Sequence, residues 1–177
     1  MKAAATKILI SESEIQRRIA EMGKRISEDY RSRPLTVVGI LKGSFIFVAD
    51  LIRQIDPEIL LEVDFIRVSS YGRGTTSSGE LRISQDIETP VEGKDVLLVE
   101  DIHDTGLTIA AVKDLLLSRK PRSLRIAALI EKESNRGQPL TLDYVGFRIP
   151  DVFVVGYGLD FDQRYRNLKE IRVLDAQ

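Results

Sequence analysis

The sequence has no cysteine, one histidine and no long apolar run, and these shortages exclude several classes of protein. Without cysteine the chain forms no disulfide and has no thiol chemistry. No apolar run approaches the roughly 20 residues that span a bilayer. Met1 and Lys2 precede Ala-Ala-Ala-Thr, not the apolar core of a signal peptide. We therefore expect a soluble cytoplasmic protein that has no membrane partner.

The sequence also lacks an excess of charge of either sign, because it has 26 Lys and Arg residues and 27 Asp and Glu residues. The net charge of −1 leaves no basic excess for binding nucleic acid, so no nucleic-acid partner is expected. The length of 177 residues suits one domain with a sizeable core. Since no linker or repeat interrupts the chain, we predict a single domain over 1–177.

Hydrophobic periodicity predicts alternating strands and helices. Ser11 and Glu14 form a possible capping box for a helix over 11–30, whose buried face would be Ile15, Ile19, Met22 and Ile26. A second helix is predicted to about residue 54 and a third over 106–119. Strands are predicted at 35–41, 60–68, 81–83, 96–99, 124–130, 142–145 and 152–155. This alternation predicts an α/β fold with a central, largely parallel sheet flanked by helices.

Residues 96–108, VLLVEDIHDTGLT, are the most informative stretch. An apolar run predicts a buried strand ending at Val99, with Glu100 and Asp101 exposed beyond it. Small and hydroxylic residues then open a helix whose apolar stripe would be Leu107, Ala111 and Leu115. Free N–H groups at a helix start bind phosphate, and carboxylates bind hydroxyls or hydrated Mg²⁺. The simpler interpretation, that Asp104 only caps the helix, leaves the two carboxylates unexplained.

This stretch resembles the signature with which type I phosphoribosyltransferases bind 5-phosphoribosyl diphosphate (PRPP). The resemblance implies the type I phosphoribosyltransferase fold, with a small hood over the base site. It implies that Glu100 and Asp101 bind the ribose and Mg²⁺, and that Asp104 is the catalytic base. Ile102 would lie beside the purine. The 5′-phosphate would be held by Asp104, Thr105, Gly106, Leu107 and Thr108.

Two further segments resemble the pyrophosphate side of the same family. The turn at 41–44 resembles the pyrophosphate loop, which implies that Lys42 and Gly43 bind there and that the Leu41–Lys42 peptide is cis. Taken alone, those four residues favour an ordinary strand-to-helix turn. Residues 69–80 resemble the mobile active-site loop, which places Ser70 and Tyr71 near the diphosphate. Composition alone predicts only a flexible surface loop there.

The base side resembles the 6-oxopurine branch of the family. The segment at 130–132 implies that Lys132 meets the purine O6, and residues 145–170 would form the C-terminal part of the hood. There Phe153 would stack on the base, the backbone of Val154 would meet its edge, Asp160 would bind a second Mg²⁺ and Arg166 would reach the pyrophosphate. General burial habits alone would instead place Phe153 in the core and Arg166 at the surface.

The resemblance implies a purine salvage enzyme that joins hypoxanthine or guanine to PRPP, giving IMP or GMP and pyrophosphate with Mg²⁺ as cofactor. Relatives of this kind form homodimers or homotetramers. Two alternatives remain, a xanthine-preferring transferase and a regulator of the same fold that senses PRPP or nucleotides. His103 stands where family members often carry an aliphatic residue. We favour a tolerated substitution that faces away from the base over a catalytic role.

Overall fold

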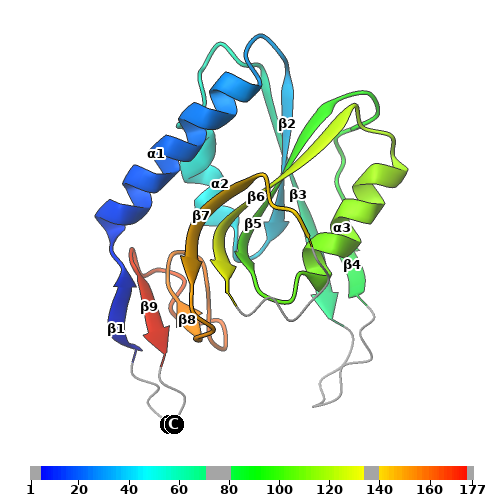
Figure 1. The fold of residues 1–177 in the computed structure, drawn as a ribbon. Helices are drawn as coiled ribbons and strands as arrows, with labels where there is room; N and C mark the ends of the chain where they lie inside the picture. Colours follow the sequence, from blue (N-terminus) through cyan, green and yellow to red (C-terminus); the bar gives the residue numbers. More distant parts are fainter. Residues whose placement is uncertain (1–4, 71–80, 134–139, 175–177) are drawn as a thin grey trace.

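The computed structural model describes residues 5–70, 81–133 and 140–174, which form two β-sheets and three α-helices (Figure 1). The larger sheet has the strand order β4-β3-β2-β5-β6-β7. Of its five strand pairings, four are parallel, and that of β3 with the edge strand β4 is antiparallel. The predicted α/β fold with a largely parallel sheet is therefore confirmed.

The elements have the following bounds in chain order: β1 (Ala5–Ile10), α1 (Glu12–Asp29), β2 (Leu35–Leu41), α2 (Phe45–Ile52), β3 (Leu61–Ser70), β4 (Leu81–Gln85), β5 (Asp95–His103), α3 (Leu107–Ser118), β6 (Ser123–Lys132), β7 (Tyr144–Ile149), β8 (Val154–Val155) and β9 (Ile171–Leu174). The helices cover both faces of the larger sheet, with α1 and α2 on one side and α3 on the other (Figure 1). None of the described helices is long and apolar enough to cross a membrane.

The first helix matches its prediction. Ser11 is the N-cap of α1 and forms the capping box with Glu14. The apolar residues of α1 that are buried against the sheet include the four predicted ones, Ile15, Ile19, Met22 and Ile26. The helix end and its buried face therefore follow from local sequence.

The predicted stripe of α3 is wrong. Its buried residues are Ile109, Val112 and Leu116, whereas Leu107 is 52% exposed. The helix carries two adjacent apolar stripes at helical spacing, so periodicity alone does not select one of them. Packing on the sheet buries the stripe of Ile109, whereas Leu107 and Ala111 of the predicted stripe are exposed and Leu115 is only partly buried.

A second, three-stranded sheet of order β1-β9-β8 lies beyond the carboxyl ends of the parallel strands (Figure 1). Together with the segment 156–168 it is called the hood here. The strands β1 and β9 were not predicted, because each is short and their antiparallel pairing joins the two ends of the described chain. The predicted C-terminal part of the hood, 145–170, begins too early. Residues up to Ile149 belong to β7 of the larger sheet, where they pair with β6.

Candidate functional site

The acidic pair, Glu100 and Asp101, lies inside a strand. β5 runs to His103, and each carboxylate residue is only 7% exposed. The prediction that both side chains are exposed beyond a strand ending at Val99 is therefore wrong. The reason is that β6 continues to pair with β5 through His103, which keeps the backbone extended and covered. Local sequence does not show how far a neighbouring strand continues.

Burial gives the acidic pair unusual electrostatics. Burial and the adjacent carboxylate of Asp101 raise the pKa of Glu100 well above its usual value. Burial also raises the pKa of Asp101, although hydrogen bonds from Glu100 and from the Ile102 backbone N–H oppose it. The pair resists carrying two negative charges, so a cation or hydroxyl donors at its open side would stabilise it.

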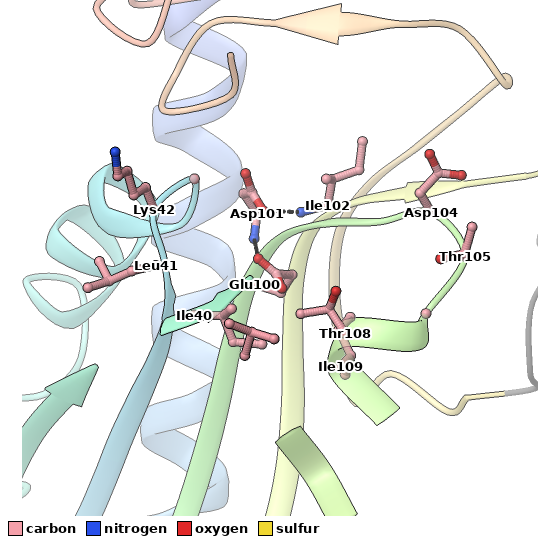
Figure 2. A pocket seen from close by; sticks show the side chains of 13 residues that line it. Ile40, Leu41, Lys42, Glu100, Asp101, Ile102, Asp104, Thr105, Thr108 and Ile109 are labelled. Carbon is pink, nitrogen blue, oxygen red and sulfur yellow. Dashed lines mark hydrogen bonds between the residues drawn. The ribbon is translucent and has the colours of Figure 1, made fainter. Parts of the chain in front are cut away.

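The turn after β2 packs directly against this pair. The peptide bond between Leu41 and Lys42 is cis, as the resemblance implied. A Cβ built on Gly43 would lie 1.7 Å from Oδ2 of Asp101, so a larger residue there would require the turn or the Asp101 side chain to move. The Ser44 hydroxyl donates to the carbonyl of Ile40 at 2.6 Å and closes the turn. The backbone at Gly43 therefore lies against the carboxylate of Asp101, and the Lys42 side chain extends from the same turn (Figure 2).

The start of α3 lacks a side-chain cap. The N-cap residue is Gly106, with a φ of 75°, and no side chain of the described residues accepts a hydrogen bond from the first turn. Asp104 therefore does not cap the helix, which removes the simpler interpretation of this residue. The free N–H groups of the first turn, with the side chains of Thr105 and Thr108 nearby (Figure 2), form a site suited to an anion.

These features surround a cavity of about 330 Å³ at the carboxyl ends of the parallel strands (Figure 2). It lies between the turn after β2, the end of β5 and the start of α3. Its lining residues are Ile40, Leu41, Lys42, Gly43, Val68, Glu100, Asp101, Ile102, Asp104, Thr105, Gly106, Thr108 and Ile109. One wall is thus acidic and the opposite wall presents free N–H groups, which suits a sugar phosphate.

A second cavity of about 310 Å³ adjoins the first on the hood side. Its lining residues are Lys42, Gly43, Asp101, Ile102, Asp104, Lys132, Phe153, Val154, Leu159, Asp160 and Arg166. Five of these, from Lys42 to Asp104 in that order, also line the first cavity. The two cavities therefore share a wall formed by the turn after β2 and the end of β5.

Lys132 lines the second cavity and is hydrogen-bonded to Asp104, which lines both cavities. Its Nζ donates to Oδ2 of Asp104 at 2.9 Å and to Oδ1 of Asp151 at 3.4 Å. Burial works to lower the pKa of Lys132, but the hydrogen bonds and charges of these two carboxylates outweigh it and raise that pKa. The ammonium group has three protons. Two point to carboxylates, and one is left for an acceptor in the second cavity.

One aromatic side chain, Phe153, lines the second cavity. Phe153 is 48% exposed, and its ring meets that of Phe161 edge-on with centroids 5.8 Å apart. The Arg166 side chain, in contrast, is only 20% exposed and forms an ion pair of 2.7 Å with Asp160. The expectation from burial habits is therefore wrong, because Phe153 is exposed and Arg166 is half-buried.

Gln163 connects the cationic groups near the shared wall. Its Oε1 accepts from Nζ of Lys42 at 3.3 Å and from Nη2 of Arg166 at 3.2 Å. Its backbone N–H donates to Oδ2 of Asp160 at 2.8 Å. One oxygen atom between an ammonium and a guanidinium group occupies a position that an oxygen of an anionic ligand could also fill.

Three residues singled out in the sequence, Ser70, Tyr71 and His103, come at or directly after the end of a strand in the chain. Ser70 is the last residue of β3, whereas Tyr71 and the rest of the loop to residue 80 lie outside the described residues. His103 is fully buried, and neither ring nitrogen has a hydrogen-bond partner among the described residues. It is not among the residues that line the two cavities. This position agrees with a side chain that faces away from the base.

Sequence reasoning missed three residues of the site: Asp151, Phe161 and Gln163. Asp151 and Phe161 lie inside or next to the segment that resembles the 6-oxopurine branch, so the segment itself was the available signal. Gln163 carried no signal, because its role follows only from the distance between Lys42 and Arg166 in space.

Comparisons with known proteins agree with this geometry. Residues 8–162 match the phosphoribosyl transferase domain family. The chain is 48% identical to the hypoxanthine-guanine phosphoribosyltransferase of Bacillus subtilis, over 98% of this chain and 96% of that relative. It is 47% identical to the hypoxanthine phosphoribosyltransferase of Haemophilus influenzae, over 95% and 94% of the two chains. A solved hypoxanthine phosphoribosyltransferase from Staphylococcus aureus has a TM-score of 0.90 at 46% identity, covering 96% of this chain and 91% of that chain.

Proposed function

Because the chain belongs to the phosphoribosyltransferase family, we propose that it transfers the 5-phosphoribosyl group of PRPP to hypoxanthine or guanine. The products would be IMP or GMP and pyrophosphate, so the protein would act in purine salvage in the cytoplasm. Residues 1–177 would work as one phosphoribosyltransferase domain, whose residues 69–80 close over the reaction centre. Like its relatives, the chain would form a homodimer or homotetramer.

The observation that carries this proposal is the shared wall between the two cavities. The first cavity suits a phosphorylated sugar, and the second suits a flat base with an acceptor on its edge. A bound sugar would then have its anomeric carbon near the shared wall, where Asp104 and Lys42 lie. Holding two reactants in this way replaces a bimolecular encounter by a reaction within one complex.

On the PRPP side, the first turn of α3 would bind the 5′-phosphate. The free N–H groups at Gly106–Thr108 and the hydroxyls of Thr105 and Thr108 are donors of the required kind. The acidic pair would accept hydrogen bonds from the ribose hydroxyls. Such bonds would satisfy carboxylates that burial otherwise disfavours.

The acidic pair also fits Mg²⁺, which usually binds one or two carboxylates together with substrate oxygens and water. Among the described residues no group of three or more acidic, His or Cys side chains could hold a metal ion. Glu100 and Asp101 would therefore hold a Mg²⁺ ion that PRPP carries in, and Asp160 would hold a second. The ion would supply positive charge to the departing pyrophosphate.

On the base side, Lys132 would donate to the purine O6 with its remaining proton while Asp104 and Asp151 hold the other two. Its raised pKa keeps it cationic, which favours a 6-oxo group over the amino group of adenine. Phe153 would stack on the base, since base–aromatic stacking contributes about 1–3 kcal/mol. The backbone of Val154 and the side chain of Ile102 would contact the base edge.

The pyrophosphate would be bound by Lys42, Arg166 and the N–H group of Gly43. The first two already share one acceptor oxygen, that of Gln163. Ser70 and Tyr71 would approach the diphosphate when the loop closes. Exclusion of water matters because the ribosyl transition state has cationic character that water would intercept.

Asp104 would accept the proton from purine N7 as the general base. We expect Asp104→Asn to lower kcat about 10²–10⁴-fold and to change the Kd for PRPP much less. The asparagine oxygen can still accept from Lys132, so the lysine keeps its place. Steady-state kinetics with direct measurement of PRPP binding tests this. Asp151→Asn is the matched control and should cause a smaller loss of kcat, and equal losses would contradict the general-base role.

Pyrophosphate release from PRPP and Mg²⁺ with hypoxanthine, guanine, xanthine, adenine and uracil in parallel tests the function itself. Turnover with hypoxanthine or guanine, and none with adenine, is expected. Xanthine as the best base would keep the chemistry and identify a xanthine-preferring transferase. Absence of turnover with every base, from protein that still binds PRPP, would favour the regulator on the same fold.

A further inference from the structure

Tyr157 lies in the hood with a backbone conformation that is unusual for a tyrosine. Its φ is 50°, between Gly156 at 100° and Gly158 at 98°. Left-handed backbone costs a residue with a Cβ roughly 1–2 kcal/mol, and such costs persist where the surroundings compensate for them. The side chain of Tyr157 must therefore make a contact that a glycine in the same place could not make.

That contact is a hydrogen bond to Asp50 in α2. Tyr157 is 4% exposed, and its hydroxyl donates to Oδ2 of Asp50 at 2.5 Å. Nε2 of Gln16 in α1 donates to the same oxygen at 3.1 Å, and Arg53 pairs with the other carboxylate oxygen. Although burial works in the opposite direction, the hydrogen bonds from Tyr157, Gln16 and Arg53 hold the pKa of Asp50 below its usual value. Asp50 thus stays an ionised acceptor.

Tyr157 and Asp50 each lie close in the chain to residues that would bind pyrophosphate. Asp50 belongs to α2, which begins immediately after the turn that carries Lys42 and Gly43. Tyr157 precedes Gly158, whose carbonyl accepts from Nη1 of Arg166 at 2.7 Å. A Cβ on Gly158 would lie 2.2 Å from the carbonyl oxygen of Gly43, so the two backbones are in contact.

We propose that Tyr157 is a positioning residue, whose hydrogen bond to Asp50 holds the hood against α2 and so sets Arg166 opposite Lys42 for binding pyrophosphate. The convergence of Lys42 and Arg166 on one oxygen of Gln163 is the arrangement that this bond maintains. The inference rests on the proposed function for the identity of the ligand. Tyr157 itself touches no reacting atom and acts through Arg166 and Gly43.

The test uses Tyr157→Phe, which keeps the ring and removes the hydroxyl. We expect the Kd of PRPP and of pyrophosphate, each measured by calorimetry with Mg²⁺, to rise about tenfold, or about 1.4 kcal/mol. The KM of hypoxanthine should change less than about twofold, because the contacts of Lys132 and Phe153 are retained. Asp50→Asn keeps an acceptor oxygen and should resemble the wild type. Asp50→Leu removes it and should resemble Tyr157→Phe, with no further loss in the double variant.

Tyr144→Phe is the matched control. Tyr144 is also buried, and its hydroxyl donates to Oδ2 of Asp29 at 2.6 Å at the start of β7, away from both cavities. The Tyr144→Phe variant should lower the free energy of unfolding, as Tyr157→Phe does, and leave the Kd of pyrophosphate unchanged. Equal Kd values of pyrophosphate for wild type and Tyr157→Phe would overturn the inference. A rise in the KM of hypoxanthine as large as the rise in the Kd of pyrophosphate would overturn it as well.

The binding readout separates this inference from the proposed function. Wild-type protein that binds pyrophosphate, with a weaker Kd in Tyr157→Phe, but turns over no base would sustain the inference and contradict the transferase reaction. Wild-type turnover with no change of Kd in Tyr157→Phe would sustain the reaction and overturn the inference. Wild-type protein that binds neither PRPP nor pyrophosphate would overturn both.

Discussion

At the scale of single residues, the site depends on how closely two segments of backbone and a buried carboxylate approach one another. A Cβ on Gly43 would lie 1.7 Å from Oδ2 of Asp101, and a Cβ on Gly158 would lie 2.2 Å from the carbonyl oxygen of Gly43. Three parts of the chain, from β5, the turn after β2 and the hood, meet at this point. Adding one methyl group at Gly43 or Gly158 would therefore disturb the contacts that hold the turn.

We expect Gly43→Ala to lower kcat/KM for PRPP at least about 100-fold, because the new Cβ would displace the turn from the carboxylate of Asp101. A displacement of about 1 Å can cost that much in an active site. Steady-state kinetics, with thermal unfolding to confirm the fold, measures the effect.

Gly93→Ala is the control for this prediction. Gly93 has a φ of 69°, but nothing lies within 4 Å of the position of its Cβ. The alanine should cost stability through backbone strain, about 1 kcal/mol, and leave the kinetics unchanged. If both variants lose activity to the same extent, steric contact with Asp101 is not the cause.

At the scale of elements, β5 is anchored at its start and functional at its end. Asp95, the first residue, has a fully buried side chain that accepts two hydrogen bonds from Arg122, at 2.5 and 3.0 Å. It also accepts from the hydroxyl of Ser123 at 2.6 Å and forms an ion pair with Arg33 at 3.3 Å. Arg33 and Arg122 lie in the connections before β2 and β6, and Ser123 is the first residue of β6. One carboxylate therefore links the starts of three neighbouring strands, at the end of the sheet opposite to the site.

This anchor predicts a pH-dependent stability. The hydrogen bonds from Arg122 hold the pKa of Asp95 below its ordinary value of 3.8. A lowered pKa means that the carboxylate stabilises the fold fully above about pH 4 and loses this effect as the pH falls through the folded-state value. We expect Asp95→Asn to lose about 1–3 kcal/mol at pH 7, with a smaller difference from the wild type below pH 4. Urea unfolding at several pH values measures this.

Asp114→Asn, at an exposed position of α3, serves as the control for the anchor. It should leave the free energy of unfolding within about 0.5 kcal/mol of the wild type at each pH. A difference between wild type and Asp95→Asn that stays constant from pH 7 down through the folded-state pKa of Asp95 would show that the charge of Asp95 does not contribute.

At the scale of the whole molecule, the site lies between two sheets that the chain connects more than once. The larger sheet and the start of α3 line the first cavity, whereas Asp160 and Arg166 of the hood, together with Phe153 just before β8, line the second. A ligand that spans both cavities binds only when the sheets are in place, so its binding stabilises the folded molecule as a unit.

We therefore expect PRPP with Mg²⁺, at about 100 times its Kd, to add about 2.7 kcal/mol to the free energy of unfolding. For a chain of this length the corresponding rise in Tm is about 5–11 °C. Removal of Mg²⁺ with EDTA should abolish most of the rise, because the acidic pair then faces the substrate without a cation. Ribose 5-phosphate, which lacks the diphosphate, should give a smaller shift that EDTA does not alter. An unchanged PRPP shift in EDTA would argue against the metal.

Local sequence was sufficient where a feature depends on neighbours in the chain. The capping box of Ser11 and Glu14, the buried face of α1 and the bounds of β2 follow from residue type and spacing. The same holds for the α/β class, because alternating strands and helices leave few other arrangements. The resemblance of short segments supplied the candidate roles of the site residues, which still await the experiments above.

Tertiary structure alone decided the rest. It buried Glu100 and Asp101 inside β5, because the pairing with β6 continues past Val99. It selected Ile109 over Leu107 for the packed face of α3 and brought β1 beside β9. It also brought Tyr157 to Asp50 across more than 100 residues. These outcomes depend on contacts between distant segments, whose free energies are absent from any local window of the sequence.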